Sequence, residues 1–169
     1  MIQLSTDKYI SKDSLIEFFE PKNIKKYENR YDELHHAIKN SDYVVTAWED
    51  GKLIGLLRSS GDYTFTQYVN NFLIHDSYVS RGIASKVLDL YLQETMDVDD
   101  IYIISGRKVT KSFTINWFHH KGFEQITSLD DFHVFRRSNQ WHLLIYYWFM
   151  PVSEQVFIFP ARLEWFLGA

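Results

Sequence analysis

The strongest constraint on the fold of this chain is a pair of apolar segments joined by Asp50-Gly51. Residues 43–48 are rich in β-branched and aromatic side chains, and residues 52–59 resume that pattern after the turn. Asp-Gly favours the left-handed backbone that a two-residue hairpin loop requires. We therefore predict an antiparallel hairpin over residues 43–59.

The remaining segments place helices and strands around this hairpin. Apolar side chains recur at helical spacing in four places: residues 13–19, residues 31–38, the segment from Ser80 on, and residues 113–122. Short apolar or alternating segments predict further strands at residues 2–4, 64–75, 101–105, 123–126 and 132–136. Helices alternate with strands only in the second half, so we expect an α/β fold of the α+β kind. Its centre would be a mixed β-sheet flanked by helices.

The amino-acid composition limits which classes of function are possible. The 169 residues include no cysteine, which excludes disulfides, thiolate metal sites and a cysteine nucleophile, and favours a reducing, cytoplasmic location. The first residues do not resemble a signal peptide, and no apolar run reaches the roughly 20 residues of a spanning helix, so no membrane is expected. Lys and Arg are scattered in a chain of net charge -4, which argues against nucleic acid as a partner.

The most informative motif lies where a predicted strand leads into a helix, at Arg81, Gly82, Ile83, Ala84, Ser85 and Lys86. Helix starts leave amide N–H groups unpaired, and small residues there let a pyrophosphate approach those donors. Arg81 and Lys86 would add cationic contacts. The alternative is that Gly82 and Ala84 only allow the helix to pack closely on the sheet.

Residues 74–85 resemble the acetyl-coenzyme A signature of the GCN5-related N-acetyltransferase family. That signature is a hydrophobic strand end, often a tyrosine, and then Q/R-x-x-G-x-G/A. Tyr78, Gly82, Ile83 and Ala84 fit it, while Val79 replaces the usual Gln or Arg. Residues 117–123 resemble a second landmark of the family, F-Y-x-x-x-G-F, and the hairpin also matches. The resemblance therefore spans residues 1–137.

The resemblance implies that two parallel strands splay apart around the pantetheine arm of acetyl-coenzyme A. By position, the backbone of Phe72, Leu73 and Ile74 would pair with that arm. It also implies N-acetylation of a small-molecule amine by direct attack on the acetyl group, with acetyl-coenzyme A as cosubstrate. Two alternatives remain: a coenzyme A-binding sensing module with little turnover, and a structural protein whose cofactor cradle is vestigial.

Two departures from the family bear on the chemistry. Phe118 stands where the family usually has a tyrosine that protonates the leaving thiolate, and we interpret it as an apolar wall beside the cofactor. Asn70 and Asn71 stand where family members often carry a carboxylate, so Asn71 is expected to orient a water. Asp62 is the remaining candidate base, although Gly61-Asp62 is also ordinary turn chemistry. Glu49 is expected at the opposite turn and is discounted.

No metal site is expected, because His35 and His36 are adjacent and do not have the i, i+3 or i, i+4 spacing of helical ligand pairs.

The family-like domain is predicted to span residues 1–139, followed by an aromatic-rich extension over residues 140–169. A hairpin over residues 141–159 would be apolar on both faces and would have to be covered. It would pack on the domain's sheet or form a homodimer interface, which we favour. The third alternative is that an altered reading frame produced the extension.

Overall fold

The computed structural model describes residues 1–106, 112–128 and 130–139. Within this part, one mixed sheet has the strand order β1-β2-β3-β4-β5-β7-β6. The strands are β1 (Ile2–Ser5), β2 (Tyr43–Glu49), β3 (Lys52–Gly61), β4 (Thr66–Ile74), β5 (Asp100–Gly106), β6 (Glu124–Ser128) and β7 (Phe132–Ser138). β4 and β5 are parallel, whereas every other neighbouring pair is antiparallel. The predicted mixed sheet is confirmed.

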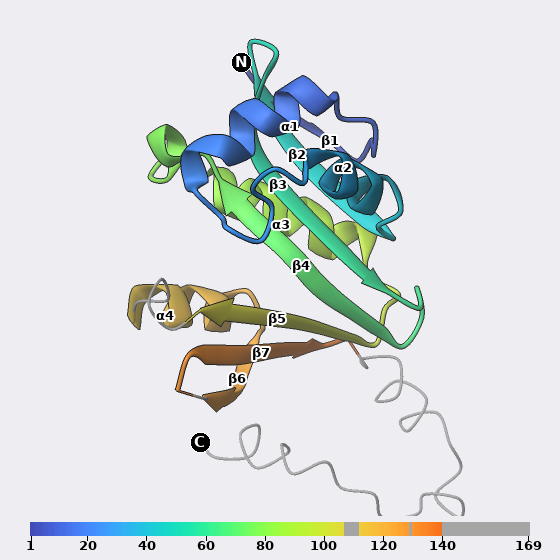
Figure 1. Cartoon of the computed structure of the whole chain (residues 1–169). Coiled ribbons are helices and arrows are strands. Elements are labelled where there is room, and N and C mark those ends of the chain that lie inside the picture. The colour runs from blue at the N-terminus through green and yellow to red at the C-terminus, as the bar shows by residue number, and fades with distance from the viewer. Residues whose placement is uncertain (107–111, 129, 140–169) are drawn as a thin grey trace, which may run out of the picture. The chain divides into compact units, whose positions relative to one another are not determined.

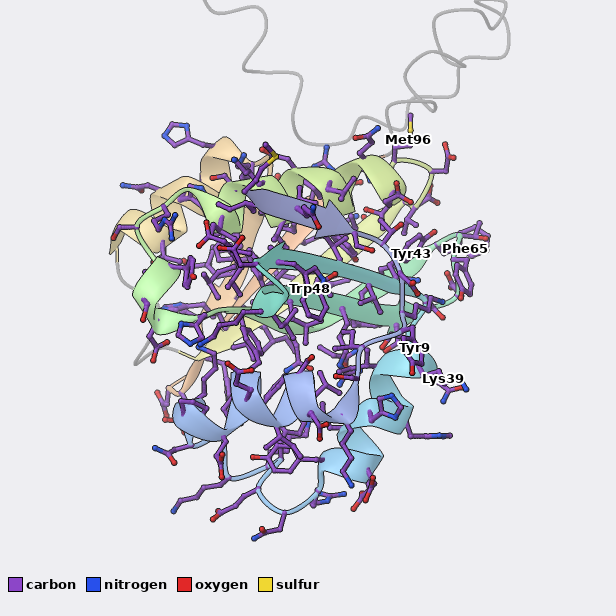
Figure 2. All side chains as sticks on the ribbon, turned by 90° about the horizontal axis from the view of Figure 1, so that it is seen from above. Tyr9, Lys39, Tyr43, Trp48, Phe65 and Met96 are labelled. Carbon is purple, nitrogen blue, oxygen red and sulfur yellow. The ribbon has the colours of Figure 1, made fainter. Side chains whose placement is uncertain are left out.

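Helices cover both faces of the sheet. They are α1 (Lys12–Phe19), α2 (Tyr31–Lys39), α3 (Ile83–Glu94) and α4 (Ser112–His120), with short 3-10 turns η1 (Glu20–Lys22) and η2 (Asp76–Tyr78). Figure 2 shows the sheet between α1 and α2 on one side and α3 on the other. Two buried apolar clusters fill the two interfaces. Trp48, labelled in Figure 2, packs against the cluster beneath α1 and α2.

The predicted hairpin forms as β2 and β3, and its turn has the expected backbone. Asp50 has φ 51° and Gly51 has φ 78°, both in the left-handed region that this turn needs. The strand predicted over residues 64–75 forms as β4, with a register shift against β3 that leaves Asn70 outside the ladder. A single extra residue of this kind is a β-bulge, which bends its strand and increases the local twist.

The helix predicted from Ser80 begins three residues later, at Ile83. Residues 76–78 form η2, and Gly82 has φ 72°, so the backbone turns sharply before the helix starts. The predicted extension over residues 140–169, with its hairpin and homodimer interface, lies outside the described residues. Within the described part, none of the helices is long and apolar enough to cross a membrane.

Gly55 fixes how closely α3 approaches the sheet. A Cβ added at Gly55 would lie 3.1 Å from Ile74 Cδ1, 3.2 Å from Ala47 Cβ and 3.4 Å from Ile83 Cγ2. Ile83 is the first residue of α3 and is fully buried. The small residue in β3 therefore sets the position of the start of α3 over the sheet.

We expect Gly55→Val to lower the free energy of unfolding by about 1–3 kcal/mol, because the added carbons overpack a buried contact. Urea denaturation would measure it. Gln3→Val, on exposed edge strand β1, is the control and should change stability by less than about 0.5 kcal/mol. Equal stability of Gly55→Val and wild type would show that the contact is loose.

Candidate active site

The site begins where β4 and β5 separate. Their parallel ladder runs from the pair Thr66 and Asp100 to the pair Val69 and Ile103 and then stops, although both strands continue. Figure 1 shows the two strands close together where they begin and farther apart where they end. The bulge at Asn70 lies at the point of divergence. One edge of β4 is therefore left without a strand partner beyond Val69.

The backbone of β4 alternates between the β3 edge and this open edge. His75 N–H donates to Ile54 C=O at 2.8 Å, and Leu56 is opposite Leu73 in the same ladder. Since hydrogen-bonded pairs alternate in an antiparallel ladder, the backbone of Leu73 faces β3, whereas that of Phe72 and Ile74 faces the open edge. The backbone of Leu73 therefore does not face the open edge, where its predicted contact with the pantetheine arm would lie. Ile74 C=O accepts a hydrogen bond from Lys22 Nζ at 2.7 Å.

The start of α3 adjoins the end of β4. Gly82 is the N-cap in a left-handed conformation, and it brings no side-chain acceptor to the first amide groups of the helix. A Cβ added at Gly82 would meet no atom within 4 Å, so open space lies above this residue. The amides of Ile83, Ala84 and Ser85 form the first turn beside that space, where the helix dipole is positive.

Arg81 at this junction is already paired. Its Nη1 and Nη2 both lie 3.2 Å from the Glu49 carboxylate, and its guanidinium carbon lies 4.7 Å from the centre of the Tyr78 ring. Glu49 therefore lies at the turn at the opposite end of β3 from Asp62, as expected. That end is where α3 starts, so the expectation that Glu49 can be discounted is not supported. Since β3 and β4 are antiparallel, the β2–β3 turn and the end of β4 come together. Lys86 is exposed in the first turn.

Trp117 connects the three elements that surround the divergence. Its Nε1 donates to Ser85 Oγ in α3 at 3.2 Å, and its ring stacks on Phe72 of β4 at 6.1 Å between centroids. Phe118, the next residue of α4, is 4% exposed and packs against Phe123 and Phe135 in the core. Trp117 therefore contacts both β4 and α3, while Phe118 supports it from the core.

Asn71 lies on the other face of β4, where it contacts Tyr27 of the segment between η1 and α2. That segment crosses β4 in Figure 1. Asn71 Oδ1 accepts a hydrogen bond from Arg58 Nε at 2.6 Å, and the same side chain is 3.1 Å from the Tyr27 hydroxyl. Arg58 Nη1 also donates to Ser41 Oγ at 3.2 Å. Asn71 and Arg58 are each 8% exposed, so this polar group is almost buried.

Asp62 is not brought together with these residues. It lies in the β3–β4 turn, at the opposite end of β4 from Ile74. One carboxylate oxygen accepts hydrogen bonds from the N–H groups of Thr64, Phe65 and Thr66, and these backbone donors lower the pKa of Asp62. An acceptor held by three backbone donors shapes the turn, so the structure gives no support to Asp62 as a base.

Sequence reasoning missed Tyr27, Arg58 and Trp117. A signal existed for Arg58, because a charged residue interrupts the apolar run of β3 and such a residue is seldom buried without a reason. Trp117 lies inside the second landmark, but the landmark gives it no role. Tyr27 lies in a segment without regular periodicity, and nothing in the sequence predicts its contact with β4.

Comparison with known proteins assigns the fold and the family. The acetyltransferase (GNAT) family model matches residues 8–123, and the chain belongs to this family. An aminoglycoside 6'-acetyltransferase type Ii structure is similar (13% identity, 81% of this chain and 97% of that chain covered, TM-score 0.68).

Two further structures illustrate the same fold. A GNAT family acetyltransferase from Staphylococcus aureus Mu50 is 17% identical, covers 82% of this chain and 99% of its own, and has a TM-score of 0.64. The PaiA N-acetyltransferase from Thermoplasma acidophilum, in complex with coenzyme A, is 10% identical, with 82% and 99% covered and a TM-score of 0.61. Comparison with curated protein sequences finds no match.

The Glu49 carboxylate should make stability depend on pH. Hydrogen bonds from Tyr78 and Arg81 hold the pKa of Glu49 below its ordinary value of 4.5. A carboxylate with a lowered folded-state pKa stabilises the fold above its unfolded pKa and loses that effect as the pH falls through the folded pKa. Glu49→Gln should therefore be less stable than wild type at neutral pH, and the gap should close in acid.

Urea denaturation of both proteins from about pH 7 down to about pH 3 measures this gap. A gap that is the same at every pH would contradict an ionic origin.

Proposed function

We propose that this chain transfers the acetyl group of acetyl-coenzyme A to the amine of a small molecule. The observation that carries the proposal is the junction of the open β4 edge with the uncapped start of α3. The family gives acetyl transfer as its general chemistry. The amine as acceptor and its small size remain our proposal.

The residues at the junction fit the chemistry of coenzyme A. The amides of Ile83, Ala84 and Ser85 would hold the pyrophosphate, because the space above Gly82 lets an anion reach them. Lys86 and Arg81 would add positive charge at the rim, with Arg81 shared with Glu49. Phe72 and Ile74 would pair with the amides of the pantetheine arm, and the Ile74 carbonyl is already engaged by Lys22.

Acetyl-coenzyme A supplies an activated thioester carbonyl when bound. The chain's part is to orient this group and to place the Phe72 N–H where negative charge develops on the carbonyl oxygen. Trp117 holds Phe72 and Ser85 in fixed relation, which keeps the two halves of the cradle aligned. Because the sequence contains no cysteine, we propose that the amine attacks the acetyl group directly, without an acetyl-cysteine intermediate on the enzyme.

The test is release of free thiol when purified protein is mixed with acetyl-coenzyme A and a panel of amines. Thiol release that requires both the protein and an amine, with acetylated amine found by mass spectrometry, supports the proposal. Binding of acetyl-coenzyme A without acetylation of any amine class would contradict it and would favour a sensing module.

Replacement of Gly82 tests the cradle. We expect Gly82→Val to weaken acetyl-coenzyme A binding at least about tenfold, or about 1.4 kcal/mol, since a branched side chain fills the space in front of the helix amides. Isothermal titration calorimetry measures this.

Gly51→Val is a matched control. Gly51 also has positive φ, at 78°, and also has nothing within 4 Å of an added Cβ, so both variants carry the same kind of backbone strain. The control lies in the hairpin turn and should bind acetyl-coenzyme A normally. Equal loss of binding in both variants would mean that strain, and not occlusion of the cradle, is responsible.

A further inference from the structure

Arg58 is a buried cation without an acidic partner. Its Nε and Nη1 donate to Asn71 Oδ1 and Ser41 Oγ, both uncharged acceptors, and in the part of the chain that the structure describes no carboxylate is in ion-pair contact with it. By contrast, Arg81 pairs with Glu49 and Arg136 with Asp100. A charge that is nearly removed from water is costly unless an opposite charge compensates it.

One side of the guanidinium stays available. Nη2 has no hydrogen-bond partner among the described residues, and it is not fully buried. A planar guanidinium with a free amino group is well suited to bind an oxyanion, because its N–H groups match the spacing of two oxygens. The compensating charge can therefore come from a ligand.

The position of Arg58 is next to the proposed reaction centre. Asn71, which Arg58 contacts, directly precedes Phe72 in β4 and is opposite Arg58 in the β3–β4 ladder. Alternation along β4 places the Phe72 side chain toward α3 and α4 and Asn71 toward α1 and α2. An acceptor that approaches the divergence from the α1 and α2 face would thus pass Arg58.

That face opens just beyond Arg58. Leu56, two residues earlier in β3, is fully buried beneath α1, whereas Ser60, two residues later, is half-buried. Tyr68 is opposite Ser60, is 51% exposed and stacks on Tyr102 of β5 at 5.3 Å. The free edge of Arg58 is therefore at the border between the covered part of the sheet and an open aromatic surface.

We propose that Arg58 forms an anion subsite for the acceptor, so that the amine acetylated by this chain also carries an oxyanion, a carboxylate or a phosphate. The proposal rests on the proposed acetyltransferase function and names its substrate class. Tyr68 and Tyr102 would support the apolar part of such a molecule.

Asn71→Asp tests the subsite without removing Arg58. The new carboxylate replaces an amide whose oxygen is 2.6 Å from Arg58 Nε, so it compensates the cation from within the protein. The variant should fold and should bind external anions poorly. Arg136→Gln, which removes a cation that is already paired with Asp100, is the matched control.

The first readout is the thermal unfolding midpoint in acetate, inorganic phosphate or chloride at equal ionic strength. For wild type and Arg136→Gln, acetate or phosphate should raise the midpoint saturably by about 2 °C over chloride. Asn71→Asp should lose the rise in acetate. Phosphate can also bind at the start of α3, so part of its rise can persist in this variant. An equal rise in acetate for Asn71→Asp, or no rise in wild type, overturns the subsite.

The second readout is thiol release with amines that differ only in bearing a carboxylate, a phosphate or neither. The amines that carry an anion should be acetylated preferentially, and the better substrate of the two identifies the preferred anion. Asn71→Asp should raise the KM for these amines at least about tenfold. Equal rates for neutral and anionic members would overturn the proposal while leaving the acetyltransferase function intact. Failure to bind acetyl-coenzyme A would instead refute the function, and the midpoint measurement would still decide whether Arg58 binds anions.

Discussion

The parting of β4 from β5 is the constraint on which the rest of the site depends. Backbone groups in a sheet normally pair with the next strand, and leaving a strand edge unpaired is costly where water is excluded. Here the ladder stops after Val69 and Ile103, and the bulge at Asn70 bends β4 at that point. The backbone of Phe72 thereby faces a sheet edge without a strand partner, and we propose that the amide groups of the cofactor pair with it there.

Contacts on both faces stabilise this separation. On one face, Trp117 links Phe72 to Ser85 and so fixes α4, β4 and the start of α3 together. On the other, Lys22 reaches Ile74 C=O and the Asp76 carboxylate, which ties η1 to the end of β4. Gly55 lets Ile83 lie directly on the sheet, so the helix start is held at the open edge. The arrangement of the proposed cradle is therefore a consequence of packing that begins in the hairpin.

Much of the fold, but less of the site, could be predicted from the sequence. The hairpin was predictable because Asp50-Gly51 has a specific backbone requirement, and the strand-to-helix junction because Gly82 precedes a helical period. The turn next to Glu49 was predicted, but its closeness to the start of α3 was not, since which turn meets the end of β4 depends on strand pairing. Leu73 shows the same limit: periodicity identifies a strand, but the edge to which each amide points depends on the register of the bulged ladder. The position of Asp62 in a turn was predictable. Its distance from the site was not, because that depends on the order of the strands in the sheet.

The most direct measurement of the central claim is amide hydrogen exchange of the protein with and without coenzyme A. We predict that the N–H groups of Phe72, Ile83, Ala84 and Ser85 exchange more slowly when coenzyme A is present, because in the proposed complex they donate to the pantetheine arm and the pyrophosphate. Unchanged exchange at these four amides, with protection appearing elsewhere, would contradict the assignment of the cradle.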